Sequence, residues 1–350
     1  MVRLRVGCCG SRVLAWLCVT LAWLTGCAPL PPEPDAPPPP AQPVAGTRAG
    51  TPLLTPWMTL TGAWRAPAPV AQPLPLPMPF LAPPSNQRLN FQLPVGVALR
   101  GELMLIADAG WRQLFRLERS RDVMVPLGPF ATALAADHAT SLQLGSDGSA
   151  WLVEPAAGQV VQLDAAGRVR RTLRDARFAS RPIAVVASEA PGDIYVADST
   201  DARIVVFEPF GRVIRRFGEG RLQSVAAMVA GPLGLYVVDR LAQQVVVFGP
   251  DGSVRQSFGE GVLVQPRAIA VDAAGRVFVA DDADQTIRVF LDGEHIASAG
   301  GRGSAPGRFG RIDAMAVDGN LLAVADGVNS RVQLLLVSPE SLRRPEGVRR

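Results

Sequence analysis

Short apolar segments that end in an acidic residue recur along most of the chain. Six of them share one pattern: an apolar residue, any residue, alanine or valine, and then the acid. Apolar runs of this length, bounded by turn residues, predict β-strands. The acids that end them are Asp108, Glu154, Asp198, Asp239, Asp281 and Asp326, separated by 46, 44, 41, 42 and 45 residues.

Three further strands accompany each of these segments. Another apolar run precedes the acid, as in residues 266–271, and another begins about five residues after it, as at Arg203 and Arg331. A turn such as Pro250-Asp251-Gly252 and a more polar strand complete the unit. Four short strands repeated at this spacing indicate the blades of a propeller. The sequence therefore predicts an all-β fold, a six-bladed β-propeller with four-stranded blades.

The last repeat lacks its fourth strand, because the chain after residue 338 shows no strand pattern. Residues 88–93, just before the first blade, alternate between polar and apolar positions. We expect them to fill the missing place and close the ring, which would remove its open edges.

The repeats resemble those of the NHL family. Residues 266–272 (PRAIAVD), 277–281 (VFVAD) and 303–309 (GSAPGRF) match successive parts of the family's pattern, and blades three and six keep its arginine as Arg203 and Arg331. The other blades replace that arginine. The resemblance covers residues 94–338 and implies a propeller. It is weak for function, since such blades serve as binding platforms, sensor domains and a few lyases.

The N-terminus has the three parts of a secretory signal. Three arginines precede an apolar run at residues 13–26, which ends in small residues before Cys27. Residues 24–27 (LTGC) resemble the lipobox of bacterial lipoproteins, which implies that Cys27 is acylated and becomes the new N-terminus. In the lipoprotein family an aspartate directly after the acylated cysteine favours retention in the inner membrane. Ala28 stands at that position here, so the resemblance implies transport to the outer membrane. The alternative is an uncleaved signal anchor.

A proline-rich segment follows the signal. It holds 19 of the 32 prolines, between Pro29 and Pro84, and this composition favours an extended tether over a packed domain. Trp57 and Trp64 are unexpected in a spacer; they either lie on the outside of the propeller or contact a partner. We thus divide the chain into a signal peptide (1–26), an anchor and tether (27–85), the propeller (86–340) and a tail (341–350).

Composition narrows the chemistry. All four cysteines lie within the first 27 residues, and only two histidines exist, His138 and His295, in different blades. A Ser-His-Asp hydrolase or a metal centre is therefore not expected, nor is a cofactor. Beyond residue 27 the chain carries 32 arginines and 31 acidic residues, which gives no basic footprint for nucleic acid. The acids of the repeats, Arg203 and Arg331 are assigned structural roles within the blades.

These observations predict a non-catalytic binding or scaffold lipoprotein of the bacterial outer membrane, with a monomeric propeller and cell-envelope proteins as partners. The rival interpretation is an enzyme of the propeller lyase or lactonase type, which would need a polar cluster at one mouth of the central channel.

Acylation of Cys27 is directly testable. Changing Cys27→Ser should abolish acylation, because a thioether-linked lipid needs the sulfur, and should block processing at that bond, so that residues 13–26 stay on the chain. Fractionation and mass determination of the N-terminal peptide measure both effects. Unchanged cleavage together with unchanged membrane attachment would contradict the lipoprotein assignment.

Overall fold

A computed structural model describes residues 52–65, 88–129, 141–175, 181–188 and 192–338. The signal peptide, Cys27 and the tail at 341–350 lie outside the described residues. The described chain is almost entirely β-structure, interrupted by two single-turn 3₁₀ helices, η1 (Arg119–Arg121) and η2 (Pro155–Ala157). No helix formed by this part of the chain has the length and apolar character needed to cross a membrane.

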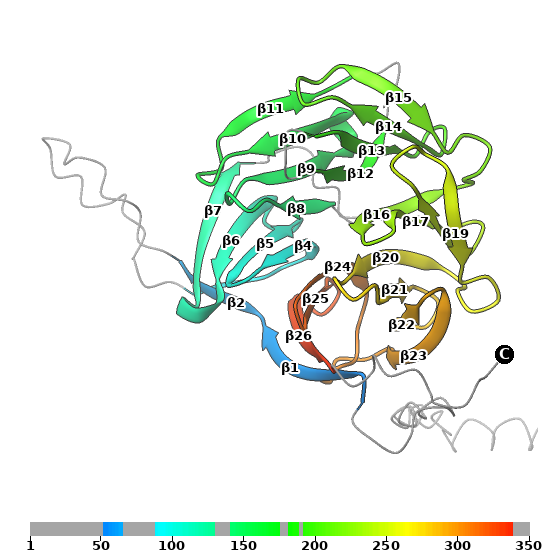
Figure 1. Cartoon of the computed structure of the whole chain (residues 1–350). Coiled ribbons are helices and arrows are strands. Elements are labelled where there is room, and N and C mark those ends of the chain that lie inside the picture. Colours follow the sequence, from blue (N-terminus) through cyan, green and yellow to red (C-terminus); the bar gives the residue numbers. More distant parts are fainter. Residues whose placement is uncertain (1–51, 66–87, 130–140, 176–180, 189–191, 339–350) are drawn as a thin grey trace, which may run out of the picture. The chain divides into compact units, whose positions relative to one another are not determined.

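Six sheets follow one another around a ring, which confirms the predicted six-bladed propeller (Figure 1). In every blade four strands run in chain order from the central axis outward, except that the outermost strand of blade six comes from the N-terminal segment, which also adds two strands outside blade one. Blade one consists of β4 (Pro94–Arg100), β5 (Leu103–Asp108), β6 (Gln113–Glu118) and β7 (Val123–Pro129), and blade two of β8 (Leu142–Leu144), β9 (Ala150–Glu154), β10 (Gln159–Leu163) and β11 (Val169–Leu173). Blade three consists of β12 (Pro182–Ala187), β13 (Ile194–Asp198), β14 (Arg203–Phe207) and β15 (Val213–Phe217), and blade four of β16 (Val225–Gly231), β17 (Gly234–Asp239), β18 (Gln244–Phe248) and β19 (Val254–Phe258). Blade five consists of β20 (Pro266–Val271), β21 (Val277–Asp281), β22 (Thr286–Leu291) and β23 (Glu294–Gly300), and blade six of β24 (Ile312–Asp318), β25 (Leu321–Asp326), β26 (Arg331–Val337) and β1 (Leu54–Leu60).

The core consists of six apolar clusters, one between each pair of neighbouring blades. Strand β17 shows why the middle strands read as continuous apolar runs. Leu235 and Val237 point into the cluster shared with blade three, whereas Tyr236 and Val238 point into the cluster shared with blade five. A strand buried on both faces needs apolar residues at every position, so the usual alternation with polar residues disappears.

The sixth blade is completed by β1, and not by residues 88–93 as the sequence analysis predicted. Strand β1 pairs antiparallel with β26, with Leu54 opposite Val337 and Leu60 opposite Val332. Leu53 and Leu54 are buried in the cluster between blades five and six. The prediction was wrong because alternation identifies a strand without identifying its partner, and because proline-rich surroundings hide the strand pattern of residues 54–60.

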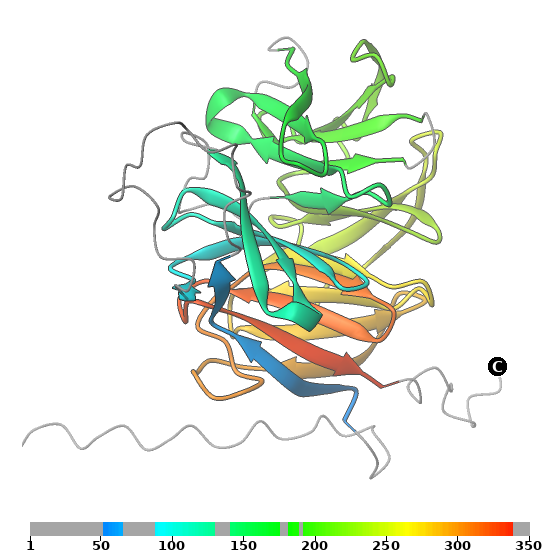
Figure 2. The same ribbon diagram turned by 90° about the vertical axis from the view of Figure 1, so that its left-hand side faces the viewer.

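Residues 88–90 form a different pairing. They are strand β3 (Arg88–Asn90), which lies antiparallel to β2 (Gly62–Arg65), and β2 in turn pairs parallel with the outer strand β7. Blade one thereby becomes a six-stranded sheet. Figure 2 shows the N-terminal segment running along the outside from blade six to blade one. Part of the segment expected to act as a tether is thus built into the propeller.

Contacts near the axis join the first and last blades. The inner strands β24 and β4 are neighbours. The Gly101 amide donates a hydrogen bond to Asp318 Oδ2 at 2.6 Å, and Ser330 Oγ donates to the Gln92 carbonyl at 2.6 Å. Ala63 of β2 is fully buried in the cluster between these two blades. The ring is therefore closed both by its inner strands and by the strand pairs β1–β26 and β2–β7.

Because β1 supplies the last strand of blade six, Leu54→Ala should destabilise the propeller. Loss of a buried leucine side chain typically lowers the free energy of unfolding by about 2–5 kcal/mol. Thr61→Ala, at an exposed turn between β1 and β2, is the matched control and should change stability by less than about 0.5 kcal/mol. Chemical denaturation of both variants measures the difference, and equal midpoints would contradict the role assigned to β1.

Candidate functional site

The six repeat acids lie on one face of the ring, which we call the acid face. Each stands at the end of the second strand of its blade, and all are buried, with at most 8% of the residue exposed. Asp108 shows the arrangement: its Oδ2 accepts from the Gln92 amide at 2.8 Å, and its Oδ1 accepts from the amides of Leu93 at 3.0 Å and Trp111 at 3.1 Å. One carboxylate therefore joins the segment that leads into the inner strand to the turn between strands two and three.

The same bonding recurs in other blades. Asp239 accepts from the amides of Gln223, Ser224 and Ala242, and Asp281 accepts from those of Val264, Gln265 and Ala283. In these three blades backbone amides occupy both oxygens of the acid, so the acid fixes the backbone of the acid face.

Arg203 and Arg331, the two arginines that match the repeat pattern, lie next to the acid of their own blade. Arg331 Nε lies 2.8 Å from Asp326 Oδ2, while its Nη atoms donate to the carbonyls of Ser304, Ala305 and Arg308. In blade three, Arg203 instead pairs with Asp201 at 2.8 Å and Glu219 at 2.9 Å, and lies 3.5 Å from Asp198. Both arginines are buried and hold loops together.

A second group of charges lies where the inner strands of blades five and six begin. Arg267 of β20 donates through Nη2 to Asp313 of β24 at 2.8 Å and through Nη1 to Asp282 at 3.1 Å. Arg311 Nε also contacts Asp313, at 2.9 Å, and Arg240 of blade four lies 3.6 Å from Asp282. We call these five residues the channel network. It links three consecutive blades on the acid face, at the end of the inner strands.

The side chains of the channel network differ in how much of each is exposed, from fully buried to nearly half exposed. The Asp313 side chain is fully buried, those of Arg267 and Asp282 are 13% and 15% exposed, and that of Arg240 is 41% exposed. Burial raises the pKa of Asp313 above its usual value; Arg267 and Arg311 oppose this shift, and the nearby charge of Asp282 adds to it. Three guanidinium groups against two carboxylates leave a formal charge of +1.

Apolar side chains stand exposed around this network. Leu241 follows Arg240 and is 69% exposed, Val264 is 49% exposed, and Val328 in the corresponding turn of blade six is 60% exposed. Trp111 occupies the equivalent turn of blade one. Their backbones are held by the buried acids, so the acid face presents apolar groups on a rigid frame beside arginine. The opposite face also carries exposed apolar residues, Phe210, Leu233 and Val254 among them.

His295 is on β23, the outer strand of blade five, and His138 lies outside the described residues. The Nε2 atom of His295 lies 2.9 Å from Ser298 Oγ and its ring packs on Phe290, but within the described chain it makes no hydrogen bond to a carboxylate. Burial lowers the pKa of His295, with a further contribution from Arg288. His295 therefore forms no Ser-His-Asp triad with the described residues.

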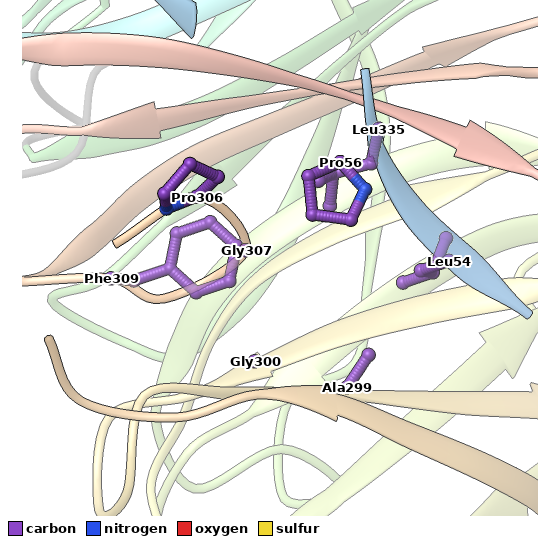
Figure 3. A pocket seen from close by; sticks show the side chains of 8 residues that line it. All are labelled: Leu54, Pro56, Ala299, Gly300, Pro306, Gly307, Phe309 and Leu335. Atoms are coloured by element: carbon purple, nitrogen blue, oxygen red, sulfur yellow. The ribbon is translucent and has the colours of Figure 1, made fainter. Parts of the chain in front are cut away.

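A shallow pocket of about 160 Å³ opens on the outer rim of the ring (Figure 3). Strand β1 forms one side of it, and the loop after β23 forms the other. Its lining contains no polar side chain; the lining residues are Leu54, Pro56, Ala299, Gly300, Pro306, Gly307, Phe309 and Leu335. This volume is below the roughly 300–1,000 Å³ of typical ligand sites. The pocket therefore marks the seam between β1 and blade five.

Trp57 and Trp64, the candidate partner contacts, lie on β1 and β2. About half of each remains exposed, 49% and 42% respectively. The strands that carry them pack on the propeller through other residues, including Leu54 and Ala63. Both tryptophans thus lie on the outside of the propeller with much of each side chain exposed, and contact with a partner stays a prediction.

Sequence reasoning missed the channel network. Arg267 and Asp313 both occupy the second position of an inner strand, and Arg240 and Asp282 both directly follow a repeat acid. Aligning the repeats by their acids would have exposed charged residues at equivalent positions in consecutive blades. Among the described residues, no three His, Cys, Asp or Glu side chains gather as a metal site requires.

Comparison with known proteins supports the fold alone. No protein-family model matches the chain, and no curated protein sequence matches it. Solved structures do: the virginiamycin B lyase of Staphylococcus aureus at 15% identity (TM-score 0.50, 71% of this chain and 86% of that one), and a streptogramin B lyase at 15% (TM-score 0.52, 72% and 85%). A protein of unknown function from Bacteroides thetaiotaomicron is 16% identical (TM-score 0.58, 71% and 70%).

The raised pKa of Asp313 predicts a specific pH dependence. Because the folded state holds this proton above the ordinary value of 3.8, the wild type loses stability relative to Asp313→Asn as the pH rises from that value through the folded pKa. Asp251, whose pKa is lowered by hydrogen bonds from Ser253, is the control of opposite sign. The wild type should gain stability relative to Asp251→Asn as the pH rises from the lowered folded pKa of Asp251 to the ordinary value of 3.8, below the range in which Asp313 acts.

Melting temperatures recorded between about pH 3 and pH 7, which brackets the usual carboxyl range, test this pair. Parallel curves for the wild type and Asp313→Asn would show that burial of Asp313 does not control its protonation.

Proposed function

We propose that this chain is a non-catalytic binding protein of the bacterial cell envelope, in which the propeller serves as a protein-interaction platform. In this proposal Cys27 carries the lipid that holds the protein at the outer membrane. The partner is a cell-envelope protein, the propeller acts as a monomer, and neither a cofactor nor nucleic acid takes part. The NHL-like repeats and the lipobox-like residues before Cys27 support the proposal.

The observation that carries the proposal is the acid face of blades four to six. Leu241, Val264 and Val328 stand exposed on this face, and Leu241 directly follows Arg240, whose side chain is 41% exposed. Arginine is enriched in protein interfaces, and a partner that covers this face removes the apolar side chains from water. The buried acids hold the backbone of this face, so little conformational entropy is lost when a partner binds.

The chemistry of the face also favours binding over catalysis. The carboxylates of the channel network are paired with arginines, and the repeat acids of blades one, four and five accept hydrogen bonds from backbone amides. Asp282 is held by ion pairs with Arg267 and Arg240. Asp313, whose pKa is raised, has no exposed surface from which to reach a substrate.

The alternative function is an enzyme of the propeller lyase or lactonase type. Two of the structural neighbours are described as lyases, and the channel network is a convergent polar cluster at the mouth of the ring. The identity of 15% limits this argument to the fold. Turnover of a lactone or cyclic peptide by the purified protein, abolished by Asp282→Asn, would replace the binding proposal.

Paired surface variants test the binding proposal. The acylated full chain, purified from detergent-solubilised membranes, should bring down at least one envelope protein in stoichiometric amount. Replacing Leu241 and Val328 by serine should reduce that protein about tenfold or more, a change of about 1.4 kcal/mol in binding free energy. Replacing Leu233 and Val254 by serine, on the opposite face, is the matched control and should leave it bound.

Quantitative mass spectrometry measures the captured protein, and melting temperatures verify that all variants are folded. Equal capture by both double variants, or no captured protein with the wild type, would contradict the proposal.

A further inference from the structure

Strand β1 differs from the other outermost strands of the propeller. Those of blades two to five, and the terminal strand β3 of blade one, each contain at least one charged residue. Charge on an edge strand is the common protection against unwanted pairing. Strand β1 reads LTPWMTL and contains none. This edge therefore lacks the charge that the other edges carry, and Pro56 and a register shift interrupt its pairing instead.

Strand β1 instead presents large apolar side chains. Trp57 is 49% exposed and Met58 41%, and Leu336 on the paired strand β26 is 36% exposed. We call these three residues the edge patch. The register with β26 shifts between Pro56 and Met58, so that Trp57 lies at a bulge without a partner opposite it. Figure 2 shows the edge formed by β1 and β26 along the outside of the ring.

The exposure of the patch does not come from loose packing. Leu54 at one end of β1 is buried between blades five and six, and Leu60 at the other end packs on the cluster between blades six and one. The strand is thus fixed at both ends while its middle faces outward. An apolar group held outward on a rigid edge marks a contact surface.

We propose that the edge patch rests on the lipid surface to which Cys27 is attached; this inference rests on the lipid anchor of the proposed function. Strand β1 is the first described strand after Cys27. The 26 residues between Cys27 and Leu54 reach at most about 90 Å even when fully extended. The anchor therefore keeps β1 at a high local concentration near the membrane, so a weak contact is enough to hold it there.

The chemistry of the patch fits a lipid interface. Tryptophan is enriched where headgroups meet acyl chains, and methionine and leucine insert between chains without a desolvation penalty for charge. A protein partner is the less favoured occupant, since protein interfaces are enriched in arginine and carry a polar rim, whereas β1 contains no charged residue. A contact along the outer rim places the axis of the ring parallel to the membrane, and the acid face then opens sideways.

The test uses single cysteines in the full, acylated chain, because the sequence after Cys27 contains no other thiol. Met58→Cys places a fluorophore on the edge patch. Ile214→Cys, on the outer strand β15 of blade three, is the matched control with 44% exposure. Each protein is reconstituted into vesicles of phosphatidylethanolamine and phosphatidylglycerol, some carrying brominated acyl chains. Unchanged melting temperatures confirm that both variants are folded.

The label at position 58 should be quenched by the brominated chains and shielded from iodide in the water, whereas the label at position 214 should show the reverse. Equal quenching at the two positions would overturn the inference. Shielding of position 58 in native membranes, without quenching in pure lipid vesicles, would also overturn it and indicate a protein partner. The mass of the N-terminal peptide reports acylation separately, so that failure of the lipid anchor is distinguished from failure of the edge contact.

Discussion

A buried carboxylate at the end of the second strand holds each blade in its place. In blades one, four and five it accepts hydrogen bonds from three backbone amides, two before the inner strand and one in the following turn. The residue four positions after the acid is left-handed in all six blades, although only Gly158 among them is a glycine. A left-handed non-glycine residue costs about 1 kcal/mol or more, and the carboxylate makes the turn favourable by satisfying its amides. The acid face is rigid for this reason.

Because the backbone of the acid face is held by these carboxylates, the exposed side chains of that face keep fixed positions. The channel network joins blade five to blade six through Arg267 and Asp313 and to blade four through Asp282 and Arg240, while apolar residues of the same face remain exposed. Buried ion pairs add little net stability but fix geometry, since removing one partner leaves a charge without compensation. The same propeller thus combines a charge network that sets the relative position of three blades with a surface suited to a partner.

The sequence was sufficient to predict the repeats and insufficient to predict how the ring closes. Six acids at regular spacing, each ending an apolar run, identify the blades because every blade repeats the same local requirement. Strand β1 has no such repeat, contains Pro56, and finds its partner only through the pairing of Leu54 with Val337. The channel network escaped for a related reason: Arg267 and Asp313 are ordinary charges in the sequence and become a pair only when neighbouring inner strands meet.

Closure of the ring by β1 also sets an order of events during synthesis. Residues 54–60 are made before any blade, whereas their partner β26 is made after the other five blades and most of the sixth. The strand must therefore wait unpaired, with its tryptophan, methionine and leucines in water, until nearly the whole chain has emerged. Contacts between residues so distant in sequence form late and slowly, and an unpaired apolar strand invites aggregation meanwhile. A chaperone that shields residues 54–60 until β26 has been made would meet this need.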